Sequence, residues 1–144
     1  CYWNFLRVYA PGGSELIDSS RHVVPGETLF SGRTWDGAAQ TMREQPGLTT
    51  FANFLLVPRA GEMTASFRYR LPAGVTEPVD DGALYRLTVF KQPGLRPEPL
   101  RLAVVLPDGA TLLSATPAPT LIEGNHITFE TTLETNLTFS VRYQ

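Results

Sequence analysis

Apolar and polar residues alternate along several short stretches, which is typical of β-strands with one buried face. The pattern is clear in residues 63–71, 85–89, 127–133 and 137–143. Turn signals rich in Gly, Pro and Asp separate these stretches. The spacing predicts about nine to eleven short strands in an all-β fold, an antiparallel immunoglobulin-like β-sandwich.

One strand-and-turn pattern occurs twice. Residues 6–17 and 102–113 share the skeleton Leu-x-Val-x-x-Pro-x-Gly-x-x-Leu-aliphatic. Pro presets φ and Gly accepts positive φ, so each copy predicts a strand, a tight turn and a returning strand that form a hairpin. We expect a single β-sandwich domain over 1–144, or two packed half-repeats, 1–92 and 98–144, joined by the stiff Pro-rich connector between them.

Two stretches break the alternation because both of their faces are apolar: Tyr2–Tyr9 and Phe51–Val57. One interpretation is that these strands are central in a sheet or covered by loops such as Gly26–Gly47. The other is that the second face meets another chain, for which aromatic side chains are well suited. The second interpretation gives these candidate interface residues: Tyr2, Trp3, Phe5, Tyr9, Phe54 and Leu56.

The remaining segments add little regular structure. Asp36–Gln45 is compatible with a short helix, an irregular loop or a short strand, and Pro46 ends it. The chain starts at Cys1 and enters an apolar strand directly, which favours a processed or partial chain over a lipid-modified N-terminus.

Composition narrows the function classes. The 144 residues carry a net charge of −2, with 12 basic and 14 acidic residues and no basic run, which argues against nucleic-acid binding. No apolar run approaches the about 18 residues that a membrane-spanning helix needs, so we expect no membrane span in this chain. The single cysteine has no partner for an internal disulfide.

The chain offers few groups for catalysis. His22 and His126 lie in no cluster with metal-ligand spacing, and Ser14 lacks the second glycine of a nucleophile elbow. Asp80-Asp81-Gly82 with Glu77 fits a turn better than a calcium loop. We therefore predict no catalytic, cofactor-binding or metal-ligating residues, no cofactor and no enzyme activity.

Two further patterns concern glycans. Tyr2, Trp3, Tyr9 and Trp35 are compatible with an aromatic platform for sugar rings, although core packing explains most of them equally well. Asn136-Leu137-Thr138 matches the glycosylation acceptor pattern, which also occurs often by chance.

The stretch 2–16 resembles a bacterial domain-of-unknown-function family, number four-zero-one-two. The shared pattern is aromatic-Asn-aromatic-Leu-Arg-Val-Tyr-x-Pro-x-Gly-Ser-x-Leu, and the similarity continues through 26–30, 67–72 and 87–94. The resemblance implies an exported, envelope-associated protein with an N-terminal membrane helix and a β-rich C-terminal part. It brings no catalytic residues, the membrane helix lies outside the matched residues, and residues 36–48 look like an insertion.

Together these observations predict a non-catalytic, extracellular structural module of the cell surface. We expect it to associate with copies of itself, as a homo-oligomer or polymer, or with another envelope protein, through strand addition and burial of aromatic side chains. A filament or surface-layer subunit would fit this description. The alternative is a carbohydrate-binding or cell-wall-binding module.

Overall fold

The computed structural model describes residues 2–144, and the predictions concerning Cys1 lie outside this range. The protein is all-β, and every strand pair is antiparallel, as the alternation predicts. The chain divides into two compact units, Cys1–Pro72 and Ala73–Gln144. The boundary therefore lies between Pro72 and Ala73, not at the Pro-rich connector 93–97, which is a loop inside the second unit.

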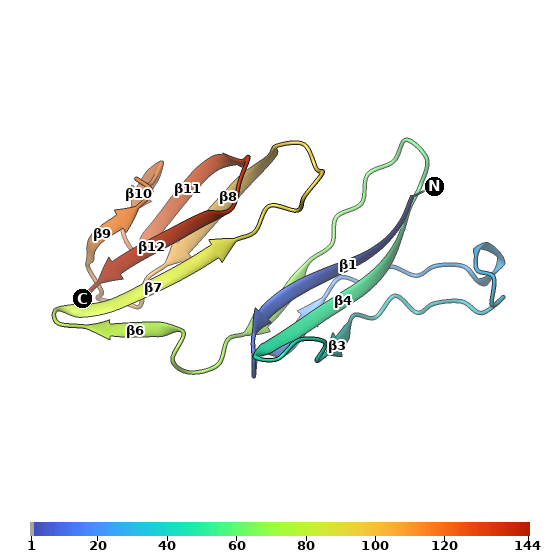
Figure 1. Cartoon of the computed structure of the whole chain (residues 1–144), viewed down its shortest axis with the longest axis horizontal. Coiled ribbons are helices and arrows are strands. Elements are labelled where there is room, and N and C mark those ends of the chain that lie inside the picture. Colours follow the sequence, from blue (N-terminus) through green and yellow to red (C-terminus); the bar gives the residue numbers. More distant parts are fainter. Residues whose placement is uncertain (1) are drawn as a thin grey trace. The chain divides into compact units, whose positions relative to one another are not determined.

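The first unit contains two small sheets (Figure 1). Its elements are β1 (Tyr2–Pro11), β2 (Glu15–Ser19), a 3-10 turn (Gly26–Thr28), β3 (Gln40–Met42), β4 (Leu48–Val57) and β5 (Phe67–Arg70). One sheet has the order β1-β4-β3 and the other pairs β2 with β5. The rings of Phe51 on β4 and Tyr69 on β5 pack at 5.1 Å between centroids and so join the two sheets.

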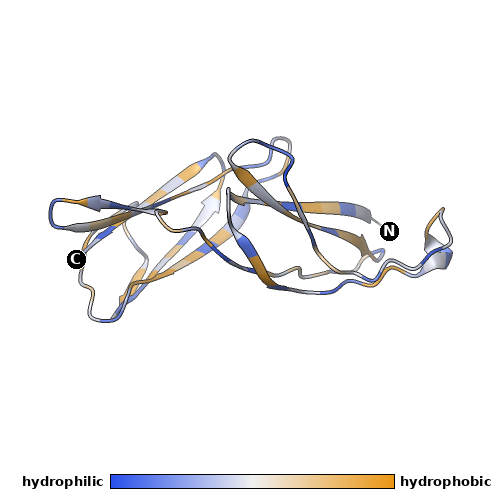
Figure 2. Ribbon diagram, turned by 90° about the horizontal axis from the view of Figure 1, so that it is seen from below, coloured by the Kyte–Doolittle hydropathy of each residue, from blue (hydrophilic) through white to orange (hydrophobic). Residues whose placement is uncertain are grey.

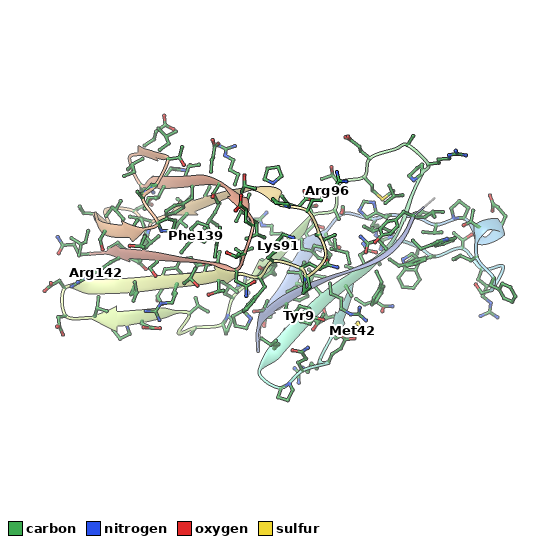
Figure 3. All side chains as sticks on the ribbon, turned by 45° about the horizontal axis from the view of Figure 1, so that its top comes forward. Tyr9, Met42, Lys91, Arg96, Phe139 and Arg142 are labelled. Carbon is green, nitrogen blue, oxygen red and sulfur yellow. The ribbon has the colours of Figure 1, made fainter. Side chains whose placement is uncertain are left out.

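The second unit repeats this plan and adds a hairpin. Its strands are β6 (Thr76–Val79), β7 (Gly82–Val89), β8 (Glu98–Val105), β9 (Leu112–Thr116), β10 (Leu121–Glu123), β11 (His126–Leu133) and β12 (Leu137–Tyr143). The sheets are β10-β11-β8 and β6-β7-β12-β9. Phe129 and Phe139, from different sheets, meet edge to face at 5.1 Å inside the core, where Figure 3 labels Phe139.

The two units match strand by strand. Strand β1 pairs with β4 as β8 pairs with β11, and β2 pairs with β5 as β9 pairs with β12. The register also agrees, because Leu16 opposite Tyr69 corresponds to Leu112 opposite Tyr143. Each pairing then shifts by one residue at the next position, so the sequence skeleton marks a true structural repeat.

The repeated pattern is not a hairpin, and that prediction was wrong. The strand after each Pro-x-Gly turn joins the other sheet of its unit, so β1 and β2 do not pair and neither do β8 and β9. Alternation fixes which side chains are buried, but it does not tell which strand lies alongside. The turn thus forms a corner between two sheets.

Two other expectations are resolved. Within Asp36–Gln45 the structure has the short strand β3 and no helix, so the short-strand alternative was correct. In the stretch 63–71 only Phe67–Arg70 is strand, and the preceding residues form a loop. Apolar and polar residues alternate along the strands in the hydropathy-coloured ribbon of Figure 2.

Candidate interaction surface on strand β1

Strand β1 lies at the edge of its sheet. Within residues 2–144 it pairs only with β4, over ten residues from Tyr2 opposite Val57 to Pro11 opposite Leu48. An edge strand has backbone N–H and C=O groups that no neighbouring strand satisfies, which makes it a template for another strand.

The backbone groups at the open edge can be assigned. The amide of Gly12 donates to the carbonyl of Gly47 at 2.7 Å, so this pair is hydrogen-bonded across the ladder. Hydrogen-bonded pairs alternate with non-bonded pairs in an antiparallel ladder. Counting back along β1, the even-numbered residues bond to β4. The odd-numbered residues turn their backbone N–H and C=O groups to the open edge: Trp3, Phe5, Arg7 and Tyr9.

The same four residues place their side chains on the outer face of the sheet. Trp3, Phe5 and Tyr9 are 46%, 38% and 48% exposed, whereas Ala10 on the opposite face is buried. The ring of Trp3 stacks on that of Phe54 with centroids 5.5 Å apart. Leu56, opposite Trp3 and half-buried, extends this apolar surface along β4.

One charged side chain crosses the surface. The guanidinium of Arg7 lies 4.5 Å above the Phe5 ring, and its Nε is 3.2 Å from a carboxylate oxygen of Glu44. A cation over an aromatic face is attracted by the ring quadrupole. Arg7 therefore covers one side of Phe5 and ties β1 to the loop before β4.

Tyr9 and Met42 flank the central strand β4 in Figure 3. Tyr9 lies opposite Thr50 from β1, and Met42 lies opposite the same residue from β3. Thr50 is fully buried between them, with its hydroxyl oxygen making no hydrogen bond. The outer face is thus closed over Thr50 and open over β1. We name Trp3, Phe5, Tyr9, Phe54 and Leu56 the β1 surface.

Tyr2 does not share this surface. It has the opposite side-chain direction to Trp3 because successive residues of a strand point to opposite faces. Tyr2 is nevertheless 65% exposed, since it lies at the very start of the strand. Five of the six candidate interface residues thus lie together.

The central-strand interpretation and the exposed-face interpretation each apply to one strand. Strand β4 is the central strand of its sheet, between β1 and β3, and its side chains are buried or half-buried on both faces. Strand β1 lacks a neighbour on one side and keeps three aromatic side chains partly exposed. The sequence did not single out Arg7 and Glu44, although the position of Arg7 between Phe5 and Tyr9 in the alternation was a signal.

The second unit provides an internal comparison for the β1 surface. When the two units are aligned by strand register, Phe5 and Phe54 occupy the positions of Arg101 and Glu130. Arg101 and Glu130 lie opposite each other and form an ion pair at 3.3 Å. Trp3 corresponds to Pro99, which has no backbone donor. Tyr9 corresponds to Val105, which is 56% exposed. The same edge and face therefore carry a charge pair, a proline and an exposed valine in one unit and three aromatic rings in the other.

The other candidate groups take part in ordinary structural contacts. Asp81 pairs with Arg142 at 3.1 Å and Glu77 pairs with Arg86 at 3.3 Å. The side-chain oxygen of Asn136 accepts a hydrogen bond from the amide of Lys91 at 2.8 Å. His22 Nε2 lies 2.8 Å from the hydroxyl of Ser20.

Residues 2–144 contain no group of three or more His, Cys, Asp or Glu side chains placed to hold a metal ion. In the same range no helix has the length and apolar character needed to cross a membrane. Comparison of the chain with protein-family models, curated proteins and solved structures finds no match.

Proposed function

We propose that the protein is a non-catalytic structural module that associates with a second copy of itself through strand β1. The observation that carries this proposal is the coincidence of an open strand edge with an exposed aromatic face on the same residues, Trp3, Phe5 and Tyr9. A second strand would satisfy the free backbone groups and cover the rings in a single step.

The pairing has a preferred register. In a two-fold antiparallel pairing of β1 with its copy, the outward-facing residues must lie opposite one another. An axis at Arg7 would bring two guanidinium groups together. An axis at Leu6 sets Trp3 against Tyr9 and Phe5 against Arg7 of the other copy, so each ring meets a ring or a cation. The two three-stranded sheets then join into one.

Burial of the rings supplies the driving force. Covering a large apolar side chain contributes about 1.5–3 kcal/mol relative to leaving it exposed, and roughly half of that remains available for rings that are already half-buried. Strand β1 contributes three of these aromatic side chains from each copy, Trp3, Phe5 and Tyr9. We also propose that the protein lies at the cell surface, as part of the bacterial envelope; this part of the proposal rests on the family resemblance described above.

The decisive variant copies the second unit onto the first. Phe5→Arg with Phe54→Glu recreates the Arg101–Glu130 pair at the matching positions, so the first unit should keep its fold. We expect light scattering to change from twice the chain mass of 15.9 kDa, or more, to the single-chain mass. The matched control is Arg101→Ala with Glu130→Ala, which should leave association unchanged.

A second pair of variants tests the strand edge separately from the rings. Tyr9→Ala removes the ring, whereas Tyr9→Pro also removes one outward N–H without touching the bonds to β4. Tyr9→Pro should weaken association more than Tyr9→Ala. If the parent chain is a monomer at high concentration, or if Phe5→Arg with Phe54→Glu associates as the parent does, the proposal is wrong.

The alternative, a carbohydrate-binding module, is favoured by the exposed Trp3 ring, which stacks on the half-buried Phe54. It predicts that cell-wall glycans change tryptophan fluorescence and that Trp3→Ala abolishes the change. A monomeric parent chain that shows this response would support the alternative.

A further inference from the structure

A second open edge lies on the other sheet of the first unit. Strand β5 pairs only with β2 in the part of the chain that the structure describes. Its counterpart β12 lies between two strands, β9 and β7. In the second unit, the position next to β12 that corresponds to the open edge of β5 is occupied by the hairpin β6–β7.

The free groups on β5 follow from its ladder. The amide of Ser20 donates to the carbonyl of Ser66, which makes this a hydrogen-bonded pair. Alternation then directs the backbone of Arg68 to β2 and the backbones of Phe67 and Tyr69 to the open edge. The equivalent residues of β12 are Val141 and Tyr143, which lie opposite Tyr85 and Ala83 of β7.

The exposed side chain of Arg68 also indicates that a hairpin would cover β5. Arg68 corresponds to Arg142, whose guanidinium pairs with Asp81 in the turn of the β6–β7 hairpin (Figure 3). Arg68 is exposed and has no acidic partner among residues 2–144. An element that covered β5 as β7 covers β12 would bring an acid to this guanidinium.

We propose that the free edge of β5 binds a β-hairpin that lies outside residues 2–144. The incoming edge strand alternates apolar and polar residues as β7 does, and the hairpin turn carries an acidic residue that pairs with Arg68. This contact is distinct from self-association through β1, because it uses the other sheet of the unit.

The probe is a synthetic peptide of residues 75–90, the β6–β7 hairpin, with a photoreactive phenylalanine in place of Tyr85. Added to the whole chain, it should cross-link next to Phe67 on β5. Cross-links confined to β1 or to β12, where the peptide would replace the chain's own hairpin, would overturn the proposal, as would the absence of binding.

Matched variants test the edge and the charge. Phe67→Pro removes one outward N–H and should lower peptide affinity about tenfold beyond the effect of Phe67→Ala. Arg68→Glu should weaken binding of the parent peptide, and Asp81→Arg in the peptide should restore it. Equal affinities for all four combinations of chain and peptide would contradict the role of Arg68.

These results can be separated from those for the β1 surface. Phe67→Pro should leave the light-scattering mass of the chain unchanged, and Phe5→Arg with Phe54→Glu should still bind the peptide. Unchanged tryptophan fluorescence of Phe67→Pro checks that the first unit is folded.

Discussion

Asn53 is the core position at which the two units differ most in chemistry. It lies on the inner face of β4 at 1% exposure, where the second unit has Phe129. Its side-chain nitrogen donates to the carbonyl oxygens of Ser20 and Gly37, both at 3.1 Å. The amide thus holds the ends of the long segment between β2 and β3 against the core, and Asn53→Ala should release them.

The cost can be worked out from these contacts. Each hydrogen bond contributes about 0.5–1.5 kcal/mol net, and a buried acceptor left without a donor costs about 1–3 kcal/mol. The side-chain oxygen of Asn53 accepts no hydrogen bond within residues 2–144, so its loss costs nothing. We expect Asn53→Ala to destabilise the first unit by about 2–4 kcal/mol, a large part of the about 4–10 kcal/mol expected for roughly 70 residues.

The chain contains its own probe for this measurement. Trp3 and Trp35 both lie in the first unit, so tryptophan fluorescence during urea unfolding follows that unit alone. With a slope of about 1–2 kcal/mol per molar urea, the midpoint should fall by about 1–4 M. Asn53→Leu keeps the volume but not the hydrogen bonds, so it separates their loss from cavity formation. A change below about 0.5 kcal/mol for Asn53→Ala would refute the assigned role, since surface substitutions commonly reach that value.

Three further predictions concern the fold. Gly37→Ala should destabilise the first unit by more than about 2 kcal/mol, because φ is +77° and an added Cβ would lie 2.4 Å from the backbone of His22; urea unfolding followed by tryptophan fluorescence measures it. Phe139→Ala should cost the second unit about 3–5 kcal/mol, seen by hydrogen exchange, while the tryptophan signal of the first unit stays unchanged. Residues 73–144, which have their own core, should fold alone and give dispersed NMR spectra; a disordered spectrum would contradict the division into two units.

Much of the fold could be predicted from the sequence because alternation directly reflects burial. The strands over 127–133 and 137–143 were predicted to within one residue, and the stretch 85–89 covers the second part of β7. The pairing partners could not be predicted, since a Pro-x-Gly turn between two alternating stretches is equally compatible with a hairpin and with a corner between sheets. Strand β3 was ambiguous because three residues are too few to establish a period.

The candidate surface was predictable in composition but not in geometry. Exposed aromatic residues at Trp3, Phe5 and Tyr9 follow from the two-sided pattern once the outer face of this sheet is known to be uncovered. Apolar content alone does not distinguish the edge strand β1 from the central strand β4, because the two are equally apolar. The ion pair of Arg7 with Glu44 joins residues far apart in the chain, so no local pattern contains it.

Comparison of the two units separates what the fold requires from what it does not. Positions that keep their character in both, such as Leu6 with Leu102 and Tyr69 with Tyr143, face the core or join the sheets. The second unit folds with a charge pair where the first has Phe5 and Phe54, so the fold alone does not require aromatic rings there. Exposed rings reduce solubility and favour aggregation unless something covers them. The rings on one copy of this repeated surface, next to an open strand edge, are therefore available for the association that we propose for β1.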